Sequence, residues 1–351
     1  MYLFLQPARY LFAAWMASAL SLGWAQTITP IRISVQPAVY SMLPVHVATL
    51  NGYWKEVGLS PSIVTYPAGL PQIKGNADWD IGVTGAVPAL IGARDFSLIT
   101  IAVADNQSRT NVLMARKELV AEIRKQRIIP KGSRMAVTLN STADYAAQTC
   151  LALWGGNIKE EMVYTGGSQA EVMEAGISGR ADILGLWAPN IYTMQEKHGY
   201  EVLCSAADFG SGIYNSVVTT RQFAKDKPEL IAAYLAATMR AVNWIKANPE
   251  KAQAFFIENS KKEGFTISPN GAKNDYELRP HFNMDEQLAV MGGSIEKIND
   301  STVGRSIYGI NVFLNEGKAG TRSVRPATFV DIGFMNKLKI DPKLSKFATQ
   351  R

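Results

Sequence analysis

Short apolar runs alternate along this chain with stretches of helical periodicity. Apolar or alternating runs typical of strands lie at 31–35, 59–66, 80–83 and 99–103. A second set of runs lies at 111–115, 135–139, 161–164, 182–187, 201–204 and 217–220. Strands that alternate with helical segments predict a parallel sheet with helices on both faces, so the chain is expected to have an α/β fold.

The clearest helix is predicted for residues 228–247. Ile231, Leu235, Met239 and Val242 fall near one stripe of it, as in an amphipathic helix that covers a core. Asn248-Pro249 ends this helix. From residue 263 to 325 the periodicity weakens, and we expect a helical, loop-rich tail there.

The segment Asp80–Leu90 joins a predicted strand to a predicted helix and is a candidate ligand-binding turn. An apolar strand passes through Thr84, Gly85 and Ala86 into a helix that carries Pro88 in its first turn. Small residues there leave backbone N–H groups at a helix N-terminus open to the negative end of a ligand. The alternative is an ordinary turn of the kind that α/β folds use repeatedly.

The second strand series lies within the first, because the last run, 217–220, follows it. We therefore predict two doubly wound lobes, with residues 26–108 and 217–351 in lobe 1 and 109–216 in lobe 2. The two crossings of the hinge would lie near 105–112 and 211–218. Since open α/β sheets bind ligands outside the carboxyl ends of their strands, we expect a cleft between the lobes.

The first 25 residues are predicted to be a signal peptide. Arg9 supplies positive charge, an apolar stretch follows from Tyr10 to Leu22, and cleavage is expected after Ala25. The apolar stretch is too short for a membrane span. We expect the protein in the periplasm.

Composition and charge exclude several kinds of function. The chain of 351 residues is 47% hydrophobic and 19% charged, with a net charge of +6, which is the composition of a globular protein. Its basic residues are scattered, and the densest cluster, 116–131, lacks interleaved aromatics, so we expect no nucleic-acid partner. The three histidines lie far apart, so we expect no metal site and no cofactor.

The two cysteines, Cys150 and Cys204, leave two alternatives open. They could pair in an oxidising compartment, but two cysteines are not a disulfide framework. Cys150 lies in an apolar helix and Cys204 at the end of an apolar run, which favours two buried thiols.

Several segments together resemble a known family. They are Ile31–Pro37, Leu43–Ala48, Gly52–Leu59, Asp80–Leu90, Lys131–Val137, Ser141–Ala143, Gly179–Asp182, Trp187–Pro189, Pro228–Leu230 and Asn248–Glu250. The chain resembles the substrate-binding proteins of bacterial ABC importers for nitrate, sulfonates and taurine, the NMT1/THI5-like group. This resemblance implies a type II periplasmic-binding-protein fold, a small-molecule ligand, an ABC permease as partner and a monomer. It is weakest from 260 to 325.

The turns at the predicted cleft supply candidate ligand contacts. In lobe 1 and at the crossings these are Gln36, Tyr40, Gly85, Ala86, Asp105, Asn106, Arg109, Tyr214 and Asn215. In lobe 2 they are Ser141, Thr142, Asp144 and Trp187. Helix starts near Tyr40, Ala86 and Thr142 favour an oxyanion, and Trp187 or Tyr40 would pack an apolar body.

Each candidate also has a structural interpretation. Trp187 could belong to the core, Arg109 could pair with an acid at the hinge, and Ser141 or Thr142 could cap a helix. Asp144 could serve the helix dipole. If Asp144 faces the cleft instead, it favours an amine or a heterocycle such as a pyrimidine.

The leading functional interpretation is a non-catalytic receptor that captures a small organic anion, such as a sulfonate or carboxylate, for import. A ligand-loaded sensor is an alternative that the sequence does not separate from import. An enzyme on this fold, such as a desulfinase, would need an activated cysteine in the cleft. Neither Cys150 nor Cys204 falls at a predicted strand-end loop, so we expect no enzyme.

Overall fold

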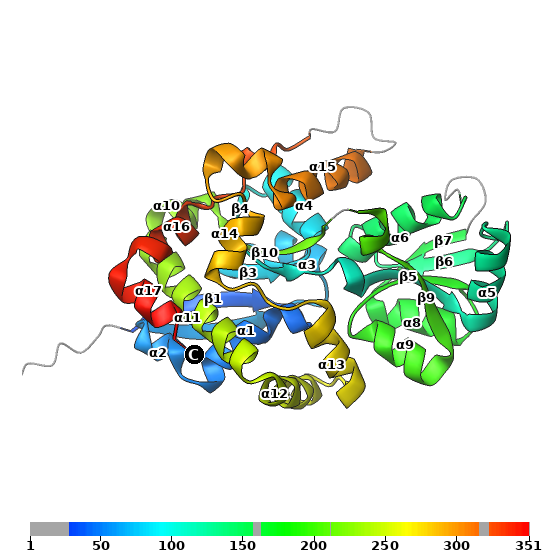
Figure 1. Cartoon of the computed structure of the whole chain (residues 1–351), viewed down its shortest axis with the longest axis horizontal. Helices are drawn as coiled ribbons and strands as arrows, with labels where there is room; N and C mark the ends of the chain where they lie inside the picture. Colours follow the sequence, from blue (N-terminus) through cyan, green and yellow to red (C-terminus); the bar gives the residue numbers. More distant parts are fainter. Residues whose placement is uncertain (1–27, 157–162, 211, 316–322, 351) are drawn as a thin grey trace, which may run out of the picture.

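The structure is a computed structural model, and it describes residues 28–156, 163–210, 212–315 and 323–350 (Figure 1). The predicted signal peptide lies outside the described residues, as do the first two residues of the strand predicted at 161–164. Among the described residues, no helix combines the length and apolar character that a membrane span requires.

The first of two five-stranded sheets has the strand order β2-β1-β3-β10-β4. Its strands are β1 (Thr29–Val35), β2 (Leu59–Thr65), β3 (Ile81–Thr84), β4 (Leu98–Asn106) and β10 (Tyr214–Thr220). Strand β1 pairs in parallel with β2 and β3, with Ile33 opposite both Ile63 and Ile81. Strand β10 runs antiparallel to β3 and β4.

The second sheet has the order β7-β6-β8-β5-β9. Its strands are β5 (Asn111–Arg116), β6 (Arg134–Val137), β7 (Val163–Gly166), β8 (Ile183–Trp187) and β9 (Tyr200–Ser205). Strand β6 is parallel to β7 and β8, whereas β5 is antiparallel to β8 and β9. We call β5–β9 with their helices the second half, and the remaining described elements the first half.

The parallel direction predicted for the strands does not hold for one strand in each sheet, β10 in the first and β5 in the second. The turns η2 (Ser108–Thr110) and η3 (Ala206–Phe209) lead from β4 to β5 and from β9 to β10. Strands β5 and β10 therefore begin at the edge where the other strands end, so they run in the opposite direction. Parallel neighbours would need a long crossover instead.

Helices cover both sheets (Figure 1). In the second half these are α5 (Lys117–Gln126), α6 (Thr142–Leu153), α8 (Gln169–Ile177) and α9 (Asn190–His198). The first half begins with η1 (Tyr40–Met42), α1 (Leu43–Leu50), α2 (Tyr53–Glu56), α3 (Gly69–Lys74) and α4 (Ala86–Asp95). After the second crossing it adds α10 (Arg221–Asp226), α11 (Pro228–Ala247), α12 (Pro249–Lys262), α16 (Gly333–Ile340) and α17 (Pro342–Ala348).

The helix predicted at 228–247 is confirmed as α11. Its predicted stripe, Ile231, Leu235, Met239 and Val242, is buried in the core of the first half. Pro228 lies at its first position, where the missing N–H costs no hydrogen bond.

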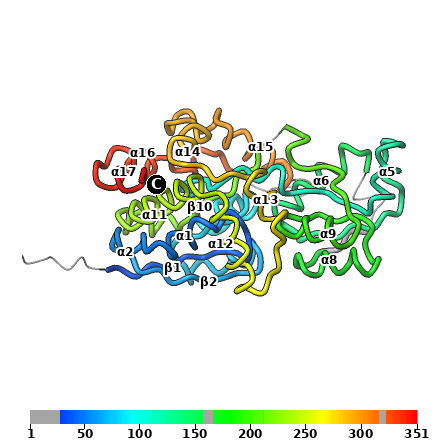
Figure 2. The backbone as a smooth tube through the Cα atoms, turned by 60° about the horizontal axis from the view of Figure 1, so that its bottom comes forward, coloured from blue at the N-terminus to red at the C-terminus, as the bar shows by residue number. Residues whose placement is uncertain are grey.

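The weakly patterned tail is largely helical, as expected, and it reaches the second half on two sides. It contains α13 (Pro269–Leu278), α14 (Met284–Val290), η4 (Ile295–Asp300), α15 (Thr302–Asn315) and η5 (Pro326–Thr328). Figure 2 shows α13 between the two halves. On the other side, Phe313 of α15 lies 5.3 Å from the ring of Tyr145 of α6.

Cys150 and Cys204 form a disulfide, so the expectation of two thiols is wrong. Cys150 lies on the buried side of α6, which packs across β5 and β9, and Cys204 lies on β9. Their Cα atoms are 5.9 Å apart although 54 positions separate them in sequence. The bond therefore ties α6 to its own sheet.

Candidate functional site

The carboxyl ends of the parallel strands meet at the facing edges of the two sheets. In the first sheet, β10 lies between β3 and β4, so its start lies beside the ends of both. This order brings Gly85, Asn106 and Asn215 to one edge. In the second sheet, the end of β8 lies beside the start of β5, with Trp187 opposite Asn111.

The N-termini of two helices, α4 of the first half and α6 of the second half, meet between the halves. Gly85 is the N-cap of α4, and a Cβ atom added to it would lie 2.5 Å from Oγ1 of Thr142 in the first turn of α6. The Val87 N–H donates to the same oxygen over 3.5 Å. The structure therefore brings the candidates Gly85, Ala86 and Thr142 together, as the argument from strand ends requires.

Ser141 and Asp144 serve the start of α6. The Ser141 hydroxyl accepts from the Asp144 N–H at 3.1 Å, which confirms Ser141 as the N-cap. The Asp144 carboxylate accepts from the Asn140 N–H at 2.8 Å, where Asn140 has a left-handed φ of 57°. Gln148 also donates to it at 2.8 Å. These bonds support the structural interpretation of Asp144, and its contact with a ligand stays a prediction.

A buried polar cluster lies at the edge of the first sheet. The Asn215 amide donates to Asp105 Oδ1 at 3.0 Å and also to the Ser41 hydroxyl. Asp105 Oδ2 has no hydrogen-bond partner among the described residues. Burial raises the pKa of Asp105 to about 6, although the nearby charge of Arg279 opposes the rise.

Tyr40 lies beside this cluster and is buried. Its hydroxyl has no hydrogen-bond partner among the described residues. Burial raises the pKa of Tyr40, and the carboxylates of Asp275 and Asp105 add to the rise, so the phenol keeps its proton at neutral pH. Its ring contacts those of Phe256 and His281, at 5.0 and 4.8 Å between centres.

The segment from Asp275 to His281 completes the cluster, and sequence reasoning missed it. Arg279 Nε donates to Asp275 Oδ1 at 2.9 Å, and neither side chain is more than 1% exposed. Tyr192 of the second half donates to the same Asp275 oxygen at 3.2 Å. The sequence signal for this segment is the i, i+4 spacing of Asp275 and Arg279, which usually marks an exposed ion pair on a helix.

His281 fixes this segment to the start of η1. Its Nε2 lies 2.9 Å from the Tyr40 carbonyl oxygen. Burial lowers the pKa of His281 to about 3, so the ring is neutral. Nε2 then donates to the carbonyl, and Nδ1 is an acceptor without a partner among the described residues.

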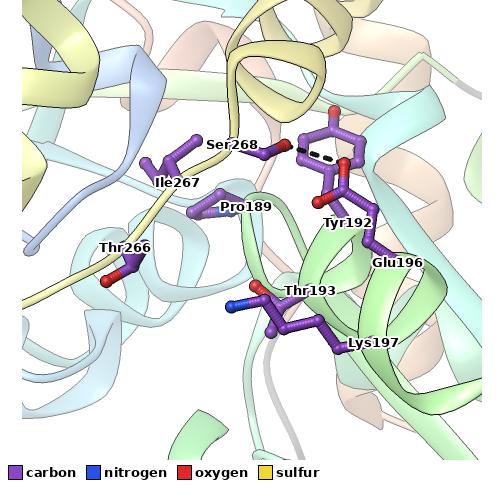
Figure 3. Close-up of a pocket in the computed structure, with 8 residues that line it drawn as sticks. All are labelled: Pro189, Tyr192, Thr193, Glu196, Lys197, Thr266, Ile267 and Ser268. Atoms are coloured by element: carbon purple, nitrogen blue, oxygen red, sulfur yellow. Dashed lines mark hydrogen bonds between the residues drawn. The ribbon is translucent and has the colours of Figure 1, made fainter.

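The seam between α9 and the segment before α13 holds a small cavity (Figure 3). Ser268 donates to Glu196 at 2.7 Å, and Asn270 donates to the same carboxylate oxygen at 3.3 Å. The cavity of about 60 Å³ is far below the size of typical ligand pockets. We therefore regard the seam as a contact between the halves.

The remaining candidates lie in several environments. The Gln36 amide donates to Gln72 at 3.0 Å, and Asn106 accepts from the Ser108 N–H at 3.0 Å, which closes a local turn. Tyr214 is buried, with its ring centre 6.1 Å from that of Phe282. Trp187 is half-buried at the end of β8, whereas Arg109 is exposed to solvent. Their roles as ligand contacts stay predictions.

A metal centre has no support in the part of the chain that the structure describes. There, no three His, Cys, Asp or Glu side chains gather as metal ligands. The polar groups described above are amides, hydroxyls, carboxylates, an imidazole and a guanidinium, which are groups that bind small organic molecules.

Two α/β halves, joined by two short crossings and facing each other with their strand ends, define the periplasmic-binding-protein fold. Within that class, the chain belongs to the NMT1/THI5-like family, whose model matches residues 40–252.

Solved structures and a curated relative agree with this assignment. The fold is similar to the alkanesulfonate-binding protein SsuA from Xanthomonas axonopodis pv. citri, with a TM-score of 0.66 and 16% identity over 87% of this chain and 99% of that one. It is also similar to the nitrate-binding protein NrtA from Synechocystis PCC 6803, with a TM-score of 0.65 and 9% identity over 92% and 88% of the two chains. A formylaminopyrimidine-binding protein from Halalkalibacterium halodurans is 23% identical over 240 residues, which are 66% of this chain and 69% of the relative.

Proposed function

We propose that this protein is the solute-binding component of an ABC importer and that it captures a small organic anion between its halves. The observation that carries the proposal is the meeting of α4 and α6 at Gly85 and Thr142. Helix N-termini present free N–H groups and a partial positive charge, so two of them at one place favour a sulfonate or carboxylate. The relatives named above are binding proteins, and we propose binding without catalysis here as well.

Capture would work by closure of two lobes, 26–108 with 217–351 and 109–216, about the crossings through η2 and η3. A ligand that touches both lobes only when they are closed binds that state more tightly and shifts the population toward it. The closed form would then dock on a permease of the inner membrane. We further propose a periplasmic monomer whose signal peptide is removed after Ala25.

A thermal-shift screen of small metabolites tests the proposed function. We expect sulfonates or carboxylates to raise the melting temperature, because a ligand that binds only the folded state stabilises it by mass action. Shifts obtained only with neutral or cationic compounds would reject the anion.

Trp187→Ala locates the site. Trp187 ends β8, and its backbone N–H donates to the Gln169 side chain at 3.2 Å, a bond that the substitution leaves intact. We expect loss of ligand binding in a folded protein. Trp154→Ala, a half-buried tryptophan at the far end of α6, is the matched control and should keep its affinity. If calorimetry gave an unchanged affinity for the Trp187 variant, this residue would have a structural role in the core and no contact with the ligand.

An amine or amino-heterocycle is the second candidate ligand. One oxygen of the buried Asp105 carboxylate has no hydrogen-bond partner within the described ranges, and this favours N–H donors. The formylaminopyrimidine-binding relative is consistent with this alternative. Aminopyrimidines therefore belong in the same screen.

A further inference from the structure

Arg279 lies between the strand ends of both sheets. Its Nη2 donates over 3.5 Å to the carbonyl of Ala188, which directly follows β8 of the second sheet. Its guanidinium carbon lies 6.0 Å from the ring centre of Tyr40, which follows β1 of the first sheet. A side chain that is 1% exposed and lies near residues that follow a strand of each sheet is inside the interface between the halves.

The guanidinium of Arg279 has more donors than the protein uses. An arginine carries five N–H groups. One donates to Asp275 and one to Ala188, so three have no acceptor among the described residues. Hydrogen bonds from a charged donor are stronger than those from a neutral one, so these N–H groups favour an acceptor on a ligand. The hydroxyl of the neighbouring Tyr40 is a buried donor without a partner among the described residues.

The carboxylate of Asp105 provides a hydrogen-bond acceptor near Arg279 and Tyr40. In the part of the chain that the structure describes, Asp105 Oδ2 is buried without a hydrogen-bond partner, while Oδ1 accepts from Asn215. Asp105 forms an antiparallel bridge with His281, two positions after Arg279, and the arginine charge opposes the rise of the Asp105 pKa. Spare donors and a spare acceptor thus lie next to one another.

We propose that Arg279, Tyr40 and Asp105 form a bipolar subsite for a small acid that also carries an N–H donor. The acid oxygens accept hydrogen bonds from Arg279 and Tyr40, and the N–H group donates to Asp105. This inference rests on the proposed function and specifies the ligand class within it.

A bipolar ligand explains what a simple anion does not. Nitrate or an alkanesulfonate offers only acceptors, so it would leave Asp105 Oδ2 unpaired and would meet a like charge there. A plain amine would leave the spare N–H groups of Arg279 unpaired. Arg279 lies beyond residues 40–252, the part that matches the family model, so the C-terminal segment of this chain supplies one member of the subsite.

Matched probes in thermal-shift assays and calorimetry test the subsite. β-Alanine and N-acetylglycine combine an acid with N–H donors, propionate carries the acid alone, and ethylamine carries the amine alone. We expect β-alanine and N-acetylglycine to raise the melting temperature and to bind at least about tenfold more tightly than propionate and ethylamine. Propionate cannot donate to Asp105, and ethylamine cannot accept from Arg279 and Tyr40.

Two conservative variants separate ligand contact from a structural role. Tyr40→Phe and Asp105→Asn should each lower the affinity for the bipolar probe about tenfold or more. Neither should lower the melting temperature without ligand, because the Tyr40 hydroxyl and Asp105 Oδ2 have no hydrogen-bond partner to lose among the residues that the structure describes. Tyr234→Phe, a buried tyrosine of α11 whose ring stacks on Trp54, is the control and should keep its affinity.

Three results would overturn the subsite. They are equal or tighter binding of propionate or ethylamine, unchanged affinity in both variants, and no shift with any of the four probes. If the metabolite screen still yields a ligand in any of these cases, the subsite fails while the solute-binding function stands. Failure of both experiments would remove the function as well.

Discussion

Two of the contacts between the halves of this protein differ in chemistry. At Gly85 and Thr142 the contact consists of small residues and backbone N–H groups. At α13 it consists of a buried ion pair, Asp275 with Arg279, bonded to Tyr192 and Ala188 of the second half. Small residues let two backbones approach, whereas buried charges are stable only while every partner is present. The Gly85–Thr142 contact therefore determines how closely the two halves approach. The Asp275–Arg279 pair makes the stability of the interface sensitive to the loss of a single side chain.

Arg279→Met should have the largest effect on stability. It leaves Asp275 buried without its charge partner, and we expect a loss of about 3–5 kcal/mol in the free energy of unfolding. Urea denaturation measures this. The double variant with Asp275→Asn should recover part of the loss, because the uncompensated charge is gone.

An exposed pair provides the control. Arg32 is bonded to Asp80 at 2.7 Å, but its side chain is 48% exposed. Arg32→Met should therefore cost less than about 1 kcal/mol. If Arg279→Met cost no more than Arg32→Met, the contrast between the two kinds of contact would be refuted.

Replacing both cysteines with serine should cost about 2–4 kcal/mol, because the bond closes a long loop in the unfolded chain. The Cys150–Cys204 disulfide anchors α6, whose first turn supplies Thr142. The substitution thus acts on the Gly85 side of the interface and leaves α13 untouched. Urea denaturation of the oxidised protein and the double variant measures it, and a difference below about 1 kcal/mol would contradict the expectation.

Asp105→Asn should stabilise the ligand-free protein at neutral pH. Burial raises the pKa of Asp105 to about 6, above its value in an unfolded chain, so the stability it contributes is present below about pH 4 and lost as pH rises through 6. An asparagine at this position does not titrate, so the free energy of unfolding of the Asp105→Asn variant should not fall in this way. Its excess over that of the unmodified protein should grow between pH 4 and 7 to on the order of 2 kcal/mol. His281 titrates in both proteins, so comparing them isolates Asp105. An advantage that does not change with pH would show that Asp105 titrates normally.

Gly85→Ala should have the smallest effect of the four on stability, and it should act mainly on closure. The added Cβ would lie 2.5 Å from Thr142 Oγ1, so the closed state is disfavoured while each half still folds. We expect about tenfold weaker ligand binding in calorimetry. Thr142→Ala in the same protein should restore much of the affinity, and a failure to restore it would place the effect elsewhere.

The sequence predicted the features that short-range signals encode. The period of α11, the proline at its start and the small residues between β3 and α4 are local, and the structure confirms them. The Cys150–Cys204 bond and the antiparallel direction of β5 and β10 depend on how distant segments pack, and no local pattern reports this. Asp275 and Arg279 were missed for the same reason, because their spacing is that of an exposed helical pair and only tertiary packing buries them.

The most direct test of the account is the distance between the halves with and without ligand. Spin labels at Lys55→Cys in α2 and Glu122→Cys in α5 would sit on exposed positions of the two halves, and both native cysteines are held in the disulfide. We expect electron–electron double resonance to show a broad distance distribution without ligand. The compound with the largest thermal shift should convert it to one narrow, displaced distribution. An identical distribution in both states, at saturating ligand, would contradict a protein that closes its two halves on a solute.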